Sequence, residues 1–334
     1  MQAFTVNRYG KKEKLHLSEV SEPVVNENDV LVQIHSAGVN LLDSLIRNGE
    51  FKIFLPYKPP FPLGHDLAGV VTKVGSKVSK FKVGDEVYSR PADHRIGTFA
   101  EYISVNEADL ALKPRDLTMD EAASIPLVGL TAWQALVEIA DLKKGQKVFI
   151  QAGSGGVGTF AIQLAKYLGA FVATTTSSAN ADLVKSLGAD IVIDYKTEDF
   201  ETKLKDYDLV LHSNRDPEIL NKSFRILRSG GKLISLVGPP TPEFAAELGL
   251  PWYLRSAMKL LRLGAKRKAK RSNTDFSFLF MRAAGDQLGE ITKLIEGGAI
   301  KPMIDKVFPF EQTNDALAYV ETGRAKGKVV VKMV

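Results

Sequence analysis

The chain of 334 residues contains no cysteine. This absence excludes disulfide bonds, thiolate metal sites and a cysteine nucleophile together. Long apolar runs are missing as well, since no stretch approaches the roughly 20 residues that a membrane-spanning helix needs. The first residues, 1–6, have the pattern of a strand and not of a signal peptide. We therefore expect a cytoplasmic protein.

Acidic residues are missing from residues 255–271, which hold eight basic ones. The eight are Arg255, Lys259, Arg262, Lys266, Arg267, Lys268, Lys270 and Arg271. Because the formal net charge of the whole chain is +5, the rest of the chain is net acidic without this patch. The basic character is therefore local and does not indicate a general affinity for nucleic acid.

The same stretch has the spacing of an amphipathic helix. Its basic stripe consists of Arg255, Lys259, Arg262 and Lys266, and the apolar stripe beside it of Leu254, Met258, Leu261 and Ala265. Two interpretations remain open. The helix contacts an anionic lipid surface peripherally, or it is a solvated helix or lid whose apolar side packs on the same chain or on a dimer partner. Nucleic acid is a lesser alternative for the same patch.

Two kinds of pattern divide the chain. Short alternating strands broken by Gly, Pro and Asn extend from about residue 30 to residue 105, which is typical of a β-rich, barrel-like domain. Strands and helices alternate after residue 118, and this alternation predicts a doubly wound parallel sheet. The strand candidates of the second part are 147–150, 171–174, 190–193, 208–212 and 231–236.

The C-terminal segment 327–333 has the pattern of a strand again. We expect this strand to return to the β-rich domain, which makes that domain discontinuous in sequence. The predicted fold is therefore α/β, with a β-rich catalytic domain at 1–122 and 301–334 and a Rossmann domain at 123–300.

A glycine-rich loop lies between the strand candidate 147–150 and a helical pattern at 159–168. It consists of Gly153, Ser154, Gly155, Gly156, Val157 and Gly158. Glycine lets the backbone turn tightly and approach a phosphate, and the helix N-terminus supplies amide groups and the positive end of a dipole. The strand candidate at 171–174 completes the βαβ unit that a dinucleotide site requires. We predict that this loop binds a dinucleotide pyrophosphate.

No acid stands at the end of the second strand, where sites specific for NAD hold the ribose hydroxyls. The segment from Thr174 to Ser178 carries hydroxyls instead, and the first carboxylate, Asp182, lies within the next predicted helix. Hydroxyls can donate to a 2′-phosphate, which a carboxylate would repel, so NADP(H) is favoured over NAD(H). The predicted contacts are Thr175, Thr176, Ser177 and Ser178. The same hydroxyls could also cap the following helix.

Further segments occur in a fixed order around the glycine loop: residues 37–43, 62–71, 75–87, 97–102, 129–133 and 321–330. Together they resemble the medium-chain dehydrogenase/reductase superfamily, and within it the zinc-free quinone oxidoreductase branch, which includes enone and alkenal reductases. The resemblance implies a GroES-like fold for the β-rich domain, NADP(H) as the cofactor, and a homodimer.

The resemblance also implies site residues. Asn40 matches the GVN segment of that branch and is the expected contact of the substrate oxygen or the nicotinamide, and Thr131 is similar to a threonine near the nicotinamide. Tyr195 is similar to a tyrosine beside the adenosine phosphate, and Lys328, in the matching C-terminal segment, is expected to contact the cofactor. Tyr57 could line the substrate cleft as a catalytic-site residue, or it could pack within its proline-flanked loop.

No metal is expected, although His65 stands where zinc-dependent relatives have a histidine ligand. Asn40 occupies the region of their cysteine ligand, and residues 89–97 are too short for a structural zinc lobe. A catalytic zinc needs three protein ligands, so one imidazole is insufficient. We expect His65 to be hydrogen-bonded in a turn, and Asp43 to be tied to Arg47 or to backbone amides.

The remaining chemistry is hydride transfer to an acceptor that is already electron-poor. Without zinc a ketone is not strongly polarised, and no tyrosine is followed four residues later by a lysine that could assist proton donation. Quinones and α,β-unsaturated carbonyls qualify because their developing charge spreads onto an oxygen. We therefore predict an NADPH-dependent quinone or enone reductase. The alternatives are a weakly catalytic nucleotide-binding module that senses redox state or binds RNA or a membrane surface through 255–271, and a small-alcohol dehydrogenase.

Overall fold

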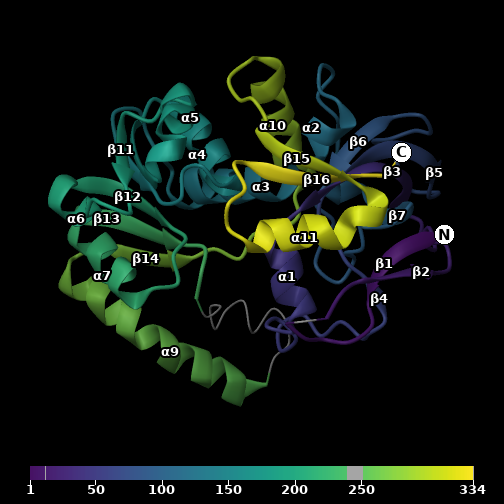
Figure 1. The fold of residues 1–334 in the computed structure, drawn as a ribbon, viewed down its shortest axis with the longest axis horizontal. Helices are drawn as coiled ribbons and strands as arrows, with labels where there is room; N and C mark the ends of the chain where they lie inside the picture. Colours follow the sequence, from purple (N-terminus) through teal and green to yellow (C-terminus); the bar gives the residue numbers. More distant parts are fainter. Residues whose placement is uncertain (12, 239–250, 334) are drawn as a thin grey trace. The chain divides into compact units, whose positions relative to one another are not determined.

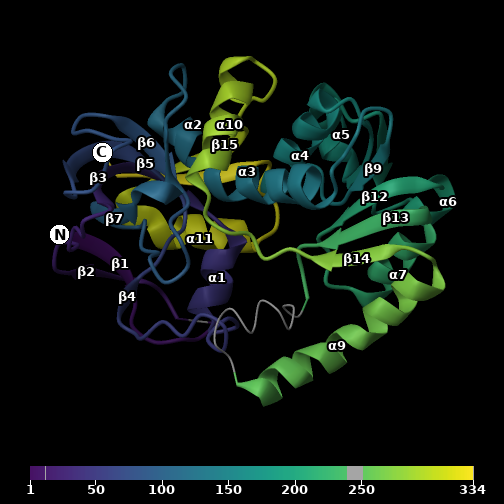
Figure 2. The ribbon, with the colours of Figure 1, turned by 180° about the vertical axis from the view of Figure 1, so that it is seen from behind.

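The computed structural model describes residues 1–11, 13–238 and 251–333. The chain divides into two compact units (Figures 1 and 2). The β-rich unit comprises Met1–Leu130 and Arg282–Val334, and the nucleotide-type unit comprises Thr131–Met281. The predicted discontinuous architecture, with a β-rich part and a Rossmann part, is thereby confirmed.

The β-rich unit is built around β3 (Asp29–Val39), a long strand whose alternate side chains Val30, Val32 and Ile34 are buried. The main sheet has the order β15 (Ile304–Pro309), β16 (Lys328–Lys332), β3, β5 (Leu67–Val74), β6 (Glu86–Ser89) and β8 (Leu110–Leu112), with β7 (Tyr102–Asn106) also paired to β3. A smaller sheet has the order β2 (His16–Glu19), β1 (Gln2–Val6) and β4 (Phe61–Pro62). Period-two burial along β3 is what the alternating sequence predicts for a half-covered sheet.

Four helices of the β-rich unit are relevant to the site. They are α1 (Leu41–Arg47), α2 (Met119–Ala123), α10 (Gly285–Glu296) and α11 (Thr313–Glu321). Helix α2 begins with a capping box between Thr118 and Glu121, which explains why it starts where the sequence pattern changes. Helix α11 packs against both α1 and β16 (Figure 1).

The C-terminal strand β16 pairs antiparallel with β3, and Val329 lies opposite Val39. The predicted return of the tail to the β-rich domain is therefore confirmed. Because Val39 directly precedes Asn40, this register brings the first residue of β16, Lys328, to the end of β3 where α1 begins.

The nucleotide-type unit contains a sheet in which every pairing is parallel. Its order is β11 (Ile191–Asp194), β10 (Phe171–Thr176), β9 (Lys147–Ile150), β12 (Tyr207–His212), β13 (Leu227–Ser235) and β14 (Asp275–Phe278). This is the doubly wound order, in which ligands bind at the carboxyl ends of the strands beside the switch point, here at β9. The sequence patterns missed β14.

Helices cover both faces of the parallel sheet. They are α4 (Gly156–Tyr167), α5 (Ala181–Ser186), α6 (Phe200–Lys203), α7 (Pro217–Arg225) and α9 (Trp252–Arg271). Helices α4 and α5 lie on one face, and α7 and α9 on the other (Figure 2). Helix α3 (Pro126–Trp133) crosses the boundary between the units and continues as a π-helix at Gln134–Ile139.

The boundaries between the units differ from the predicted ones. The predicted Rossmann domain, 123–300, includes helix α10. This helix instead packs on β8, where a Cβ added to Gly285 would lie 2.3 Å from the Leu110 carbonyl oxygen. The Tyr88 hydroxyl also donates to the Leu288 carbonyl in α10 at 2.7 Å. The division therefore falls between residues 281 and 282 and not after residue 300, and at the other boundary it falls after Leu130.

Candidate active site

The glycine loop connects β9 to α4 in the nucleotide-type unit. A Cβ on Gly153 would lie 2.1 Å from Thr174 Oγ1, and one on Gly158 would lie 2.3 Å from the Ala152 carbonyl oxygen, so glycine is required at both positions. At the helix N-terminus, Gly155 supplies no side-chain cap. The amides of the first turn are therefore left for another acceptor, and the loop fits a pyrophosphate.

Three threonine hydroxyls at the end of β10 form hydrogen bonds to β9 and to the glycine loop. Thr174 Oγ1 donates to the Ile150 carbonyl at 2.7 Å, and Thr175 Oγ1 accepts from the Ala152 amide at 3.2 Å, so both stabilise the glycine loop from the adjacent strand. Thr176 Oγ1 donates to Ser154 Oγ at 2.9 Å and thereby joins strand and loop. The capping alternative does not hold for Ser177, whose side chain makes no cap bond to the following turn.

Two predicted residues beyond β10 are open to solvent. Ser178 and Tyr195 are both exposed, and the Ser178 amide donates to Asp194 Oδ2 at 3.1 Å. Backbone donors from Lys196 and Ser178 hold the pKa of Asp194 below its usual range, so this carboxylate is ionised at neutral pH. Asp194, which the sequence patterns did not indicate, brings an acid beside Ser178, in a segment that has none in sequence.

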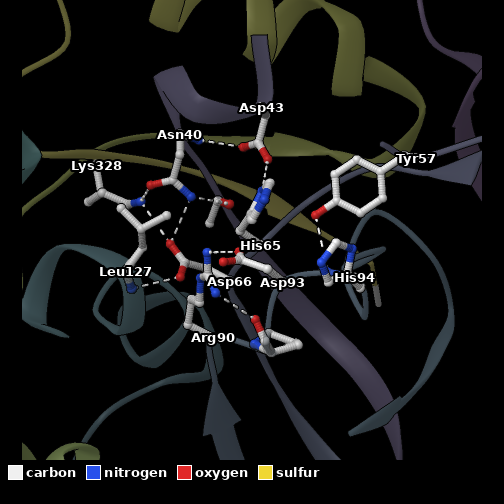
Figure 3. A network of polar contacts seen from close by, with 12 residues as sticks. Asn40, Asp43, Tyr57, His65, Asp66, Arg90, Asp93, His94, Leu127 and Lys328 are labelled. Carbon is white, nitrogen blue, oxygen red and sulfur yellow. Dashed lines mark hydrogen bonds and ion pairs between the residues drawn. The ribbon is translucent and has the colours of Figure 1, made fainter. Parts of the chain in front are cut away.

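A buried polar cluster in the β-rich unit joins Asn40, Asp66 and Lys328 (Figure 3). Asn40 Nδ2 donates to Asp66 Oδ2 at 2.9 Å, and Lys328 Nζ donates to the same oxygen at 3.0 Å and also to Asn40 Oδ1. The other oxygen of Asp66 accepts from the Leu127 amide at 2.8 Å, at the start of α3. Asn40 and Lys328, which were predicted separately, are therefore brought together by Asp66, which was not predicted.

Asp43 connects this cluster to His65. Asp43 Oδ2 accepts from the Asn40 amide at 2.7 Å, and His65 Nδ1 lies 2.6 Å from Asp43 Oδ1. Both side chains are fully buried, and His65 Nε2 has no hydrogen-bond partner among the described residues. The histidine is thus bonded within the fold, and Asp43 is tied to a backbone amide. Of the two options for Asp43, the tie to Arg47 is wrong, because Arg47 pairs with Glu321 at 2.6 Å.

Tyr57 lies in a separate aromatic cluster. Its ring stacks on Phe61 with centroids 5.0 Å apart, and its hydroxyl accepts from the His94 amide at 3.3 Å (Figure 3). Burial raises the pKa of Tyr57, so the hydroxyl stays protonated at neutral pH. These contacts fit the packing alternative that the sequence left open. Thr131 is buried in α3, in the nucleotide-type unit.

The predicted basic helix is present as α9. The side chains of Leu254, Arg255, Lys259, Leu261, Arg262, Ala265 and Lys266 lie outside the described residues. Met258 and Ala269, eleven residues apart and so on one face, are buried, and Ala269 belongs to the apolar core of this unit. Four basic residues at the C-terminal end are exposed: Arg267, Lys268, Lys270 and Arg271.

Among residues 1–11, 13–238 and 251–333, no three His, Cys, Asp or Glu side chains gather as a metal site would require. Within the same ranges, no helix combines the length and the apolar character needed to cross a membrane.

Comparison with known proteins identifies the family. A family model described as "Alcohol dehydrogenase GroES-like domain" matches residues 26–115, and another described as "Zinc-binding dehydrogenase" matches residues 187–331. A 2-methylene-furan-3-one reductase of Solanum lycopersicum is 36% identical, over 99% of this chain and 79% of that protein. The chain belongs to the medium-chain dehydrogenase/reductase superfamily, in the quinone oxidoreductase branch.

Further members of the superfamily agree. A chloroplastic NADPH-dependent alkenal/one oxidoreductase of Arabidopsis thaliana is 35% identical, over 99% of this chain and 79% of that protein. The solved structure of the quinone oxidoreductase from Coxiella burnetii superposes with a TM-score of 0.87 at 29% identity, covering 100% of this chain and 99% of that chain. The predicted superfamily and fold class are thereby confirmed, and the protein is an oxidoreductase.

Proposed function

We propose that this member of the medium-chain dehydrogenase/reductase superfamily reduces quinones or α,β-unsaturated carbonyls with NADPH. Two relatives support the reaction class: the NADPH-dependent alkenal/one oxidoreductase and the 2-methylene-furan-3-one reductase. The first of these is named as NADPH-dependent, which supports the cofactor. The structural observation that carries the proposal is the buried ammonium group of Lys328, held by Asn40 and Asp66.

Lys328 has one donor more than the cluster uses. An ammonium group carries three N–H donors, and the described residues accept two of them, at Asn40 Oδ1 and Asp66 Oδ2. The third N–H is left for an oxygen of the acceptor. In a buried site a fixed cationic donor stabilises charge that develops on a carbonyl oxygen during hydride transfer.

Asn40 then has a positioning role. Its Oδ1 accepts from Lys328, and its Nδ2 donates to Asp66 and, at 3.4 Å, to the Gly38 carbonyl. All polar atoms of the amide are therefore engaged within the β-rich unit. This arrangement supports a revision of the sequence-based role, in which Asn40 itself contacts the substrate: Asn40 orients Lys328, and Lys328 makes the contact.

The residues that would hold the cofactor lie in the nucleotide-type unit. The glycine loop and the N-terminus of α4 would bind the pyrophosphate, and Ser154, Thr176 and Tyr195 would lie toward the adenosine ribose, with Thr131 toward the nicotinamide. NADPH supplies the hydride when bound. We include independence from zinc, a homodimeric state and a cytoplasmic location in the proposal, and the first of these is tested below.

Turnover of a small panel of acceptors tests the proposal. Purified protein with NADPH is assayed against a simple quinone, an enal, an enone and a primary alcohol with NADP⁺. We expect oxidation of NADPH with at least one of the first three and none with the alcohol. Binding of NADPH without turnover of any electrophilic acceptor would favour the nucleotide-binding module, and turnover of the alcohol alone would favour the dehydrogenase. Sedimentation of the same sample gives the oligomeric state.

A further inference from the structure

Ser154 of the glycine loop, Thr176 at the end of β10 and Asn180 form a hydrogen-bonded cluster, and the proposed function gives Asn180 no role. Thr176 Oγ1 donates to Ser154 Oγ at 2.9 Å, and Asn180 Nδ2 donates to the same oxygen at 3.2 Å. Ser154 Oγ therefore accepts two hydrogen bonds. Its own O–H is not needed within the cluster and remains as a donor for a further group.

Asn180 contributes an acceptor to the same place. Its Oδ1 is buried and has no hydrogen-bond partner among the described residues. Buried acceptors are normally satisfied, so a donor is expected at this atom. The cluster thus offers one O–H donor, from Ser154, and one carbonyl acceptor, from Asn180, next to each other at the carboxyl end of β10.

This is the position at which a Rossmann unit meets the adenosine ribose. Sites specific for NAD place an acid here that accepts from the 2′-hydroxyl, whereas sites for NADP place a cation near the 2′-phosphate. This chain does neither, since residues 171–184 contain no Lys or Arg and the one acid, Asp182, lies in α5. Two opposite charges follow β11: the ionised Asp194, which accepts from the Ser178 amide, and the exposed Lys196, which acts on Asp194.

We propose that Asn180, held on Ser154, sets the selectivity between NADPH and NADH and leaves both cofactors usable. The Ser154 hydroxyl donates to a 2′-phosphate oxygen. The Asn180 amide turns toward the ribose, and its Oδ1, which is buried without the cofactor, accepts from a 2′-hydroxyl. Each cofactor therefore has one uncharged hydrogen-bond partner at its 2′-position. The ratio of the dissociation constants of NADH and NADPH stays below about tenfold, or 1.4 kcal/mol. This inference rests on the proposed function, because it presumes that the glycine loop binds a pyridine dinucleotide.

Equilibrium binding without an acceptor distinguishes a failure of this inference from a failure of the proposed function. Dissociation constants for NADPH and NADH are measured on the full chain by titration calorimetry, together with those for 2′,5′-ADP and 5′-ADP, which differ only in the 2′-phosphate. Three variants are compared: Asn180→Lys, Asn180→Asp and Ser154→Ala. The matched control is Asn28→Lys, which adds the same charge at an exposed asparagine in the β-rich unit.

We expect the wild-type ratio of the two cofactor dissociation constants to lie below about tenfold. Asn180→Lys should raise the preference for NADPH at least tenfold, and Asn180→Asp should reverse it, because charge at this position attracts or repels the phosphate. Ser154→Ala should weaken NADPH and 2′,5′-ADP and spare NADH and 5′-ADP.

Several outcomes would overturn the inference. Selectivity unchanged in both Asn180 variants, or changed equally by Asn28→Lys, would remove Asn180 from this role. A wild-type preference above a hundredfold in either direction would contradict the dual use. If neither cofactor binds the wild type, the proposed function fails and the inference with it, whereas binding of both with unchanged selectivity in the variants removes the inference alone. Circular dichroism confirms that each variant is folded.

Discussion

Lys328 is the residue on which the proposed chemistry depends most directly. Replacing it by methionine keeps the length of the side chain but removes the N–H donors, so kcat/KM for an enone or a quinone should fall by about a hundredfold, as for the loss of one oxyanion donor. Dissociation of NADPH, measured by fluorescence, should change much less. Lys332→Met is the matched control, since Lys332 lies on the same strand and is exposed.

The same measurement on Asn40→Ala distinguishes positioning from contact. Loss of Asn40 leaves the ammonium of Lys328 paired with Asp66 alone, so kcat should fall by less than in Lys328→Met while NADPH binding is retained. A kcat/KM unchanged in both variants would contradict any role of the cluster in catalysis. A larger loss in Asn40→Ala than in Lys328→Met would restore Asn40 as the contact itself.

The charge of Asp29 makes the free energy of unfolding depend on pH at acidic values. Arg95 binds it with two nitrogens at 2.8 and 2.7 Å and lowers its pKa from 3.8 to about 2. A carboxyl with a depressed pKa in the folded state stabilises the fold above its unfolded pKa, and this contribution is lost as pH falls from about 4 to about 2. Asp29→Asn should lower the free energy of unfolding at pH 7 by about 1–3 kcal/mol.

Urea unfolding at several pH values checks the effect of Asp29. The variant should lose less stability than the wild type between pH 4 and pH 2, because the titrating group is gone. Asp182→Asn, at an exposed carboxylate, serves as the control and should leave both the midpoint and its pH dependence unchanged. An Asp29→Asn midpoint equal to that of the wild type at pH 7 would contradict the assignment.

At the scale of the element, α4 depends on glycine at its first turn. A Cβ on Gly158 would lie 2.3 Å from the Ala152 carbonyl oxygen and 2.6 Å from Gly153 Cα, and backbone atoms cannot yield as a flexible side chain does. Gly158→Ala should therefore displace the loop and weaken NADPH binding at least tenfold. Gly289→Ala in α10 is the control, because that position is open and alanine should stabilise a helix by about 0.5–1 kcal/mol. NADPH binding by Gly158→Ala at wild-type strength would contradict the predicted loop.

Elements with a strong local pattern could be predicted from the sequence. The glycine loop and β9 were located where the structure has them, because a turn that needs glycine and a buried apolar strand leave local signatures. Strand β14 and the packing of α10 on β8 were missed, since α10 is amphipathic and its pattern does not say which sheet it covers. The contact between Asn40 and Lys328 spans 288 residues. It follows from the register in which β16 pairs with β3, and no local sequence pattern specifies that register.

Helix α9 carries the surface prediction. Trp252 and Tyr253 are exposed at its N-terminal end, and among the described residues Arg267, Lys270 and Arg271 form no ion pair. Exposed aromatic and basic residues on one helix are what the membrane interpretation requires, since each basic residue near an anionic surface contributes about 1 kcal/mol. The protein should therefore sediment with vesicles containing phosphatidylglycerol at low salt and be released at high salt.

A charge-matched pair of variants tests the membrane contact. The triple change Arg267→Gln, Lys270→Gln and Arg271→Gln should reduce vesicle binding more than tenfold, whereas Lys52→Gln, Lys73→Gln and Lys185→Gln, at exposed positions elsewhere, should not. No binding of the wild type at low salt would favour the alternative in which α9 is a solvated helix packed on its own chain by Met258 and Ala269.

At the scale of the whole molecule, the absence of cysteine determines what the β-rich unit can hold. Relatives that use zinc need three protein ligands, yet this chain has no thiolate, and Asp43 already occupies Nδ1 of His65. One remaining imidazole nitrogen supplies a single ligand, and among the described residues no three His, Cys, Asp or Glu side chains gather. Protein dialysed against a chelator should therefore keep its full activity with NADPH and contain less than about 0.1 zinc ion per chain. Added Zn²⁺ should not raise the rate. As the control, a zinc-dependent alcohol dehydrogenase treated in parallel should lose activity. Stoichiometric zinc that activity requires would mean that ligands come together in a way that the described residues do not show.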